Sequence, residues 1–206
     1  MNISDEGSNL IIREETGGKT YWIRQGLNRP TWPGFSSGVT IGCGYDIGYR
    51  RPADLRSDWD AIFDDEELER LSKACGITKE PARALVSDLS DIQVSWDDAI
   101  TVFRQATLPR YYLMALRIYP QIESIHPHSA TALVSLVFNR GNSLVSSDSE
   151  DRRREMRQIR EALVQNRIDL IPGYIRSMKR IWPNHEGLQR RRDNEAKLFE
   201  MGLQAA

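Results

Sequence analysis

Carboxylate side chains stand at two places near the start of the chain where they could act on the same bond. Glu14 and Glu15 end the apolar segment that begins at Leu10, and Asp46 follows Thr40 within a glycine-rich string. Glycoside hydrolysis needs one protonated carboxyl group, which gives a proton to the leaving oxygen, and one ionised carboxylate, which assists water or the developing cation. These residues therefore fit a pair of carboxylates held across a cleft, with Thr40 holding the water.

The glycine-rich string runs from Trp32 to Tyr49, and its glycines alternate with polar and aromatic residues. Such a segment lets the backbone approach another group closely while Thr40, Tyr45 and Asp46 project from it. The even separation of Thr40 and Asp46 places both side chains on one face of a regular strand. A purely structural interpretation stays open, in which the string forms tight turns and Asp46 caps one of them. The string is not a phosphate-binding loop, because no Gly-Lys-Ser/Thr follows it.

The elements that carry these residues are a short helix and a small β-region. The segment Leu10–Glu15 predicts a helix with Ser8 or Asn9 as its N-cap, and the glycine pair at 17–18 ends it. Residues 16–51 predict an irregular β-region on loops, because glycines and prolines interrupt β-forming residues.

From Pro52 onward the hydrophobic pattern is helical almost to the end of the chain. An apolar stripe at i, i+3, i+4 and i+7 predicts a buried central helix and consists of Ala130, Leu133, Val134 and Val137. Helices are expected at about residues 65–75, 79–90, 95–105, 108–118, 127–139, 151–165, 169–180 and 186–202. We predict an α+β, mostly α fold in which residues 1–206 form a single domain, with a glycine-rich β-subregion at 16–51 beside a helical body at 52–206.

The composition is that of a globular protein. The 206 residues are 40% hydrophobic and 28% charged with a net charge of -1, which excludes disordered and fibrous classes. No apolar run is long enough to span a membrane, and the N-terminal residues contain no apolar signal segment. Residues 151–206 carry 13 Lys and Arg against 8 Asp and Glu, and this net charge of +5 suggests an anionic partner. A pI near 6.3 and the lack of a reading motif disfavour a nucleic-acid binder.

The cysteines and histidines do not form a recognisable site. Cys43, Cys75 and the three histidines lack the spacing of a metal site or a disulfide framework. Nothing near Cys43 in the sequence would activate a thiolate, so a cysteine nucleophile is not expected. We expect no metal and no cofactor.

One segment of the string carries a specific resemblance, and it stands as Ser37-Gly38-Val39-Thr40-Ile41-Gly42-Cys43-Gly44-Tyr45-Asp46-Ile47-Gly48. It resembles phage-type lysozymes, and more closely the lysozyme-like domain of pesticin-like bacteriocins and cell-wall-degrading effectors. Those proteins place a catalytic Glu at the end of the first helix, followed by a β-region with Ser-Gly-Val-Thr-Ile-Gly-x-Gly-Tyr/Phe-Asp-Leu/Ile-Gly. The resemblance continues more loosely at residues 138–141, 178–182 and 191–196, whereas residues 52–125 carry little of it.

The resemblance implies a lysozyme-like fold and a role for each matched residue. Glu15 is the general acid, Thr40 positions the water and Asp46 is the second carboxylate. The aromatic pair at 21–22 aligns the acid with Glu15, and Glu14 remains the alternative. The better known phage enzymes place Asp before Thr, whereas Thr40 precedes Asp46 here, an order similar to the pesticin branch.

The resemblance also implies the reaction, which is hydrolysis of the β-1,4 bond between N-acetylmuramic acid and N-acetylglucosamine in peptidoglycan. The alternative is a catalytically inactive glycan-binding or phage-tail structural module. Endolysin, secreted effector and toxin domain all stay open, and an effector would have an immunity or inhibitor protein as its partner. The chain is expected to be made in the cytoplasm without a signal peptide and to act in the periplasm or cell wall after delivery by a secretion system, a holin or a fused domain. We expect a monomer with peptidoglycan strands as its partner, and neither nucleic acid nor membrane.

Four residues are candidates for contact with the substrate. Tyr21 and Tyr45 carry rings that can stack on sugar faces. Asn139 and Arg140 end the predicted central helix before Gly141. They either present polar groups to a cleft, or Arg140 complements the negative C-terminus of that helix.

The remaining aromatic and basic residues are expected to be structural. Trp182 is expected to be a packing residue. The runs Arg152–Arg154 and Arg190–Arg192 are expected to be solvated helix faces, with contact to an anionic polymer as the alternative.

Overall fold

The computed structural model describes residues 1–146 and 149–205 of the chain. The fold is α+β and mostly α, as predicted, and the strands within the described residues form a two-stranded antiparallel sheet. The α-helices are α1 (Asp5–Thr16), α2 (Lys19–Arg24), α3 (Pro52–Trp59), α4 (Asp65–Ser72), α5 (Glu80–Leu85), α6 (Trp96–Val102), α7 (Leu108–Ile118), α8 (Pro127–Arg140), α9 (Arg154–Val164), α10 (Ile171–Ser177) and α11 (Glu186–Gln204). The strands are β1 (Thr40–Ile41) and β2 (Tyr45–Asp46), and the 3-10 helices include η1 (Ile47–Tyr49) and η6 (Met178–Ile181).

The chain divides into two compact units whose boundary differs from the predicted division at residue 51. Unit 1 consists of Met1–Ile11 and Pro109–Ala206, and unit 2 consists of Ile12–Leu108. Unit 2 extends beyond the glycine-rich region because Leu55 and Trp59 of α3 are buried in the same core as Ile41 of β1. The organisation of residues 1–206 as a single domain stays a prediction.

The first helix begins earlier than predicted and ends where predicted, at Thr16. Its N-cap is Ser4, whose hydroxyl oxygen accepts a hydrogen bond from Gly7 N–H at 3.0 Å. The prediction of Ser8 or Asn9 as the N-cap was therefore wrong. Acidic residues in the first turn favour the earlier start, because they complement the positive end of the helix dipole.

Helix α2 lies where the sequence predicts irregular β-structure. No side chain caps its N-terminus, so it lacks the local signal of a helix start. Its Trp22 is buried, and the indole N–H donates a hydrogen bond to the Gly42 carbonyl at 3.2 Å. A helix of this length depends on such tertiary burial rather than on propensity. The prediction failed here because the stabilising contact comes from a distant part of the chain.

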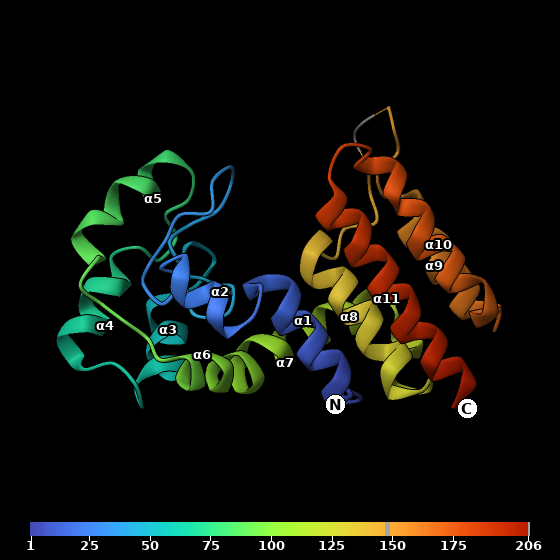
Figure 1. The fold of residues 1–206 in the computed structure, drawn as a ribbon, viewed down its shortest axis with the longest axis horizontal. Helices are drawn as coiled ribbons and strands as arrows, with labels where there is room; N and C mark the ends of the chain where they lie inside the picture. Colours follow the sequence, from blue (N-terminus) through green and yellow to red (C-terminus); the bar gives the residue numbers. More distant parts are fainter. Residues whose placement is uncertain (147–148, 206) are drawn as a thin grey trace. The chain divides into compact units, whose positions relative to one another are not determined.

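The central helix of unit 1 is α8, as predicted. The residues of its apolar stripe are fully buried: Ala130, Leu133, Val134 and Val137. Figure 1 shows α11 lying beside α8, and α10 packs against both α11 and α9. Among the residues that the structure describes, no helix is both long enough and apolar enough to cross a membrane.

A buried group of charges joins α8 to α11. The Glu195 carboxylate accepts hydrogen bonds from Ser135 Oγ at 2.7 Å, Arg191 Nε at 3.1 Å and Arg192 Nη2 at 2.9 Å. Arg191 and Arg192 are buried, so the prediction that the run Arg190–Arg192 is a solvated face was wrong for these two residues. Removing one partner of a buried ion pair typically costs roughly 3–5 kcal/mol, because a charge is left uncompensated.

The segments that flank the sheet in unit 2 meet at two glycines. A Cβ atom on Gly38 would lie 2.4 Å from Gly48 Cα, and a Cβ atom on Gly48 would lie 2.5 Å from the Ile77 carbonyl oxygen. Both neighbours are backbone atoms, so they cannot move aside as a flexible side chain would. The glycines of the string therefore permit a close backbone approach, as their pattern predicted.

We expect Gly38→Ala to destabilise the protein by about 1–3 kcal/mol, because the added methyl group overpacks a rigid backbone contact. The measurement is urea unfolding followed by circular dichroism. Gly173→Ala is the matched control, since Gly173 lies in α10 with no atom within 4 Å of the added Cβ. A Gly38→Ala variant as stable as the control would show that the contact at Gly48 is not tight in solution.

Candidate active site

The hairpin β1–β2 places Thr40 and Asp46 directly opposite each other. The register pairs Thr40 with Asp46 and Ile41 with Tyr45. Residues opposite each other in an antiparallel pair project from the same face, with Cβ atoms about 4.5–5.5 Å apart. The prediction that Thr40 and Asp46 share a face is confirmed, and Ile41 and Tyr45 occupy the opposite face.

The Asp46 carboxylate is anchored by backbone N–H groups. Gly48 N–H donates to Oδ1 at 2.9 Å, and Gly38 N–H is shared between Oδ1 and Oδ2 at 3.1 Å each. The contact with Gly48 makes Asp46 the N-cap of η1, which is the structural role that the sequence left open. An ionised carboxylate offers about four acceptor sites, so these bonds leave capacity for a water molecule.

The protonation of Asp46 reflects competing influences. Partial burial raises the pKa of the carboxyl group above its ordinary value and is the largest effect. Hydrogen bonds from Gly38 and Gly48, and the positive charge of Arg50, oppose this rise because they favour the ionised form. A carboxylate with a raised pKa is a better proton acceptor than an ordinary aspartate.

The Thr40 hydroxyl lies half-buried beside Asp46. It donates a long hydrogen bond of 3.4 Å to the Gly38 carbonyl. Among the described residues no group donates to Thr40 Oγ1, so its acceptor side is available to a water molecule. Thr40 is held in place through its backbone, which exchanges two hydrogen bonds with Thr31 at 2.8 and 2.9 Å.

Glu15 lies in the last turn of α1, and its charge acts on the hairpin. Burial raises the pKa of the Cys43 thiol, and the Glu15 carboxylate adds to this rise, so the charge of Glu15 acts on the turn that joins β1 to β2. The charge of Glu15 thus acts on the turn of the hairpin whose strands carry Thr40 and Asp46. The choice between Glu15 and Glu14 as the acid stays a prediction.

Tyr45 is not a sugar-stacking residue. Its side chain is 1% exposed, its hydroxyl donates to Asp58 Oδ2 at 2.6 Å, and its ring meets Trp59 edge-on at 5.5 Å. The prediction of substrate contact is therefore corrected, because the alternation that puts Asp46 on one face sends Tyr45 into the core. Tyr21, in contrast, is 45% exposed on α2, and its role in substrate binding stays a prediction.

Arg50 is a residue of the site that the sequence analysis did not single out. Its guanidinium lies over the Tyr45 ring at 5.1 Å, and its charge acts on Asp46. Its buried Nε has no hydrogen-bond partner among the described residues. The signal was present, since Arg50 stands four positions after Asp46 and directly follows the string.

Asn139 and Arg140 belong to unit 1. They end α8, and they line a hollow together with Arg152, Arg153 and Trp182. The structure agrees with both interpretations that the sequence left open, because Arg140 lines the hollow and is also the basic residue in the last turn of α8. Within the described part of the chain, no group of three or more His, Cys, Asp or Glu side chains is placed to hold a metal ion.

Most of the chain matches a known protein family. The family described as Domain of unknown function (DUF8812) matches residues 13–182, which is most of the chain. The matched span contains Glu15, Thr40, Asp46 and Arg140. No curated protein matches the chain at a significant level.

The two cysteines are expected to differ in reactivity. Both are free, Cys43 is buried and Cys75 is half-buried, and burial raises the pKa of each thiol. Iodoacetamide at about pH 8 should therefore modify Cys75 of the native protein first and Cys43 much later, since the thiolate is the reactive form. Peptide mass spectrometry measures both rates, and in urea they should converge. Native Cys43 reacting as fast as Cys75 would contradict its burial.

Proposed function

The chain belongs to the DUF8812 family of domains of unknown function, and we propose that it is a peptidoglycan hydrolase of the muramidase type. Its substrate is the glycan strand, and it cleaves the β-1,4 bond between N-acetylmuramic acid and N-acetylglucosamine. Its place of action is the bacterial cell wall or periplasm, where this polymer lies.

One observation carries the proposal: the hairpin register that pairs Thr40 with Asp46, with the charge of Glu15 reaching the turn of the same hairpin. We infer that the carboxyl groups of Glu15 and Asp46 act on one bond, because glycoside hydrolysis uses two carboxyl groups that flank the scissile bond. Their match to the lysozyme-like pattern supports the same reaction. The exposed Tyr21 on α2 is the proposed aromatic contact for a sugar ring.

Each residue has a defined task in the proposed mechanism. Glu15, as the acid, gives its proton to the glycosidic oxygen as the bond breaks. Asp46 and the Thr40 hydroxyl hold a water molecule and direct it at the anomeric carbon. The backbone bonds of Asp46 fix the carboxylate in one orientation, so little reorganisation is needed when charge develops.

Digestion of purified peptidoglycan tests the proposal. Muramidase action releases muropeptides with N-acetylmuramic acid at the reducing end, which mass spectrometry after borohydride reduction identifies. Binding to the polymer without release of reducing ends would favour the alternative of an inactive glycan-binding module.

We expect Glu15→Gln to fold normally and to lose activity by roughly 10²–10⁴-fold, because an amide cannot donate the proton that the leaving oxygen requires. Glu14→Gln is the matched control on the same helix turn and should retain most activity. The measurement is the rate of reducing-end release from purified peptidoglycan. Exchanged results would move the acid to Glu14, and full activity in both variants would remove the acid from this helix end.

Substitutions of Asp46 separate its structural role from its chemical one. Asp46→Asn keeps an oxygen that can cap η1, so it should fold and yet be nearly inactive. Asp46→Ala should in addition lose about 0.5–2 kcal/mol of stability with the cap. Rates on peptidoglycan and urea unfolding give the two readouts. An active Asp46→Asn variant would restrict Asp46 to the structural role.

The pH dependence of stability supplies a further readout for the same pair of variants. Because folding raises the pKa of Asp46, its favourable contribution is fully present below the unfolded pKa and is lost as pH rises through the folded pKa. Asp46→Asn does not titrate, so its unfolding free energy should lack this decline across the acidic range. An unchanged pH profile would show that Asp46 has an ordinary pKa.

A further inference from the structure

A hollow in unit 1 is lined by cationic and polar side chains. It has a volume of about 250 Å³ and its lining consists of Asn139, Arg140, Arg152, Arg153 and Trp182. All five residues lie in unit 1, so the hollow is formed without any contribution from the hairpin of unit 2.

Trp182 holds guanidinium groups around the hollow. The guanidinium carbon of Arg140 lies 4.9 Å from the centre of the indole ring, and that of Arg152 lies 6.0 Å from it. Arg192 also lies over this ring, at 5.6 Å, and donates a hydrogen bond to Asn139 Oδ1 at 3.3 Å. With its oxygen used in this way, the Asn139 amide presents its NH₂ group as a donor.

The guanidinium group of Arg140 has a donor without an acceptor partner in the described part of the chain. Its Nη2 donates to the Arg152 carbonyl, and its buried Nε has no hydrogen-bond partner among the described residues. An unsatisfied buried donor costs free energy, and a charged one costs more. Burial, and then the charges of Arg153, Arg192 and Arg152, lower the pKa of Arg140 to about 10. The charge of Glu155 opposes this lowering, but it is the smallest of these effects, so positive charge predominates around Arg140.

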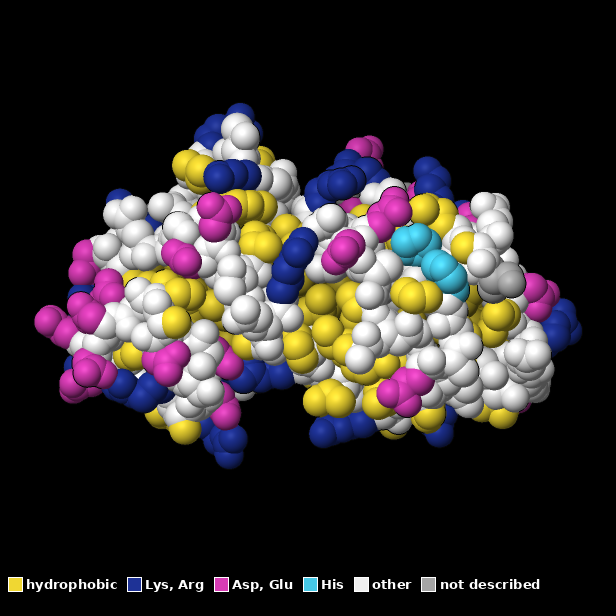
Figure 2. Space-filling model, turned by 90° about the horizontal axis from the view of Figure 1, so that it is seen from below, with side chains coloured by type: hydrophobic (Ala, Val, Ile, Leu, Met, Phe, Trp, Pro, Cys, Tyr) yellow, Lys and Arg dark blue, Asp and Glu magenta, His cyan; other side chains and the backbone are white. Residues whose placement is uncertain are grey.

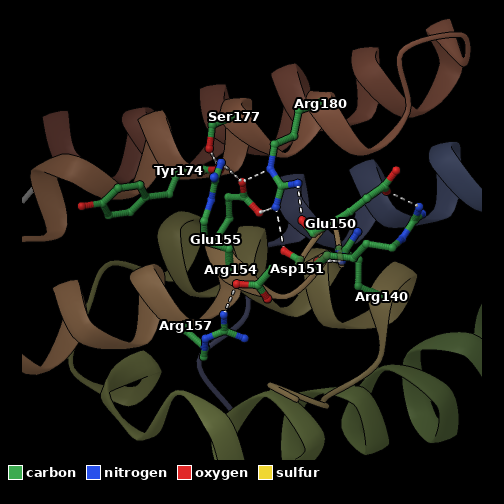
Figure 3. Close-up of polar contacts among 10 residues, drawn as sticks. Arg140, Glu150, Asp151, Arg154, Glu155, Arg157, Tyr174, Ser177 and Arg180 are labelled. Carbon is green, nitrogen blue, oxygen red and sulfur yellow. Dashed lines mark hydrogen bonds and ion pairs between the residues drawn. The ribbon is translucent and has the colours of Figure 1, made fainter. Parts of the chain in front are cut away.

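One buried carboxylate whose charge acts on Arg140, that of Glu155, is itself bonded by two other arginines. Glu155 is fully buried and accepts hydrogen bonds from Arg154 at 2.9 Å and from Arg180 at 2.6 and 3.0 Å, as Figure 3 shows. Arg180 also donates to the carbonyls of Glu150 and Asp151 at 2.8 and 2.7 Å. This network fixes the turn that leads into Arg152 and Arg153, so the cationic lining is positioned by a buried ion pair.

Charged side chains are unevenly distributed along the chain. Acidic side chains gather at the left edge of the face drawn in Figure 2, and α4 of unit 2 carries three acidic residues in its first turn. The carboxylate of Glu150 lies 3.5 Å from Arg152 Nη1 but is mostly exposed, so solvent weakens this pair. The basic excess of residues 151–206 includes Arg152 and Arg153 of the hollow.

We propose that this hollow binds a single oxyanion, a phosphate or carboxylate group, through guanidinium N–H groups of Arg140, Arg152 and Arg153 and the amide of Asn139. Guanidinium groups bind both oxyanions through parallel charge-assisted hydrogen bonds. The ligand also supplies an acceptor for the unsatisfied donor of Arg140. The proposal stands on unit 1 alone and does not rest on muramidase activity.

The test titrates the folded full-length chain with inorganic phosphate in one arm and acetate in another, against sodium chloride of matched ionic strength. The readout is the indole N–H signal of Trp182 in a nitrogen-proton NMR spectrum, assigned with Trp182→Phe. We expect a saturable shift of this signal, while the indole signals of the buried Trp22 and Trp59 stay in place.

Two variants make the test specific. Arg152→Gln keeps the backbone carbonyl that Arg140 uses and should weaken binding about tenfold, the effect of losing one hydrogen bond to a charged group. Arg160→Gln makes the same charge change at an exposed position of α9 outside the hollow and should bind as the wild type does. Proton spectra of both variants confirm folding.

The outcomes identify the class of anion that binds and show whether the proposal holds. Saturation by phosphate alone identifies a phosphate-bearing ligand, and saturation by acetate alone identifies a carboxylate-bearing one. No saturable shift in either arm, or equal weakening in Arg152→Gln and Arg160→Gln, would overturn the proposal. The titration contains no peptidoglycan, so a failure of the anion-binding proposal is distinct from a failure of the proposed hydrolase activity.

Discussion

The bonding of the Asp46 carboxylate to the backbone of Gly38 and Gly48 is the constraint on which the candidate site depends. It draws the segment before β1 to the segment after β2, where only glycines leave room. With both ends held, the register of the hairpin is set, and Thr40 stands opposite Asp46. Asp46 is thus proposed to act on water and also holds together the backbone around it. The capping role and the proposed catalytic role of Asp46 are therefore compatible.

The sequence predicted what depends on local pattern and missed what depends on distant contacts. The helical periodicity after Pro52 located α4 to α11, and the even spacing of Thr40 and Asp46 located their common face. The burial of Tyr45 could not be read from its residue type, because an aromatic ring suits a core and a sugar surface equally well. Helix α2 was missed for a related reason, since Trp22 gains its stabilising bond from Gly42.

The two runs of three arginines, Arg152–Arg154 and Arg190–Arg192, have different structural roles. In α11 the spacing from Arg191 and Arg192 to Glu195 is i, i+4 and i, i+3, which the sequence displays and which fits an ion pair on one helix face. What it does not display is that this face turns toward Ser135 of α8 and becomes buried. In the other run, Arg152 borders the hollow while Arg154 bonds the buried Glu155, so neighbours in sequence serve different structures.

The division of the chain into units has a consequence for the order in which the protein can form during synthesis. Unit 2 is one continuous stretch, Ile12–Leu108, whereas unit 1 is assembled from the first eleven residues and everything after Leu108. Asn2 donates to the carbonyls of Ile122 and Ile125, partners that the ribosome delivers only after all of unit 2. The hairpin can therefore fold before the N-terminal residues meet their partners, and unit 1 is completed after unit 2.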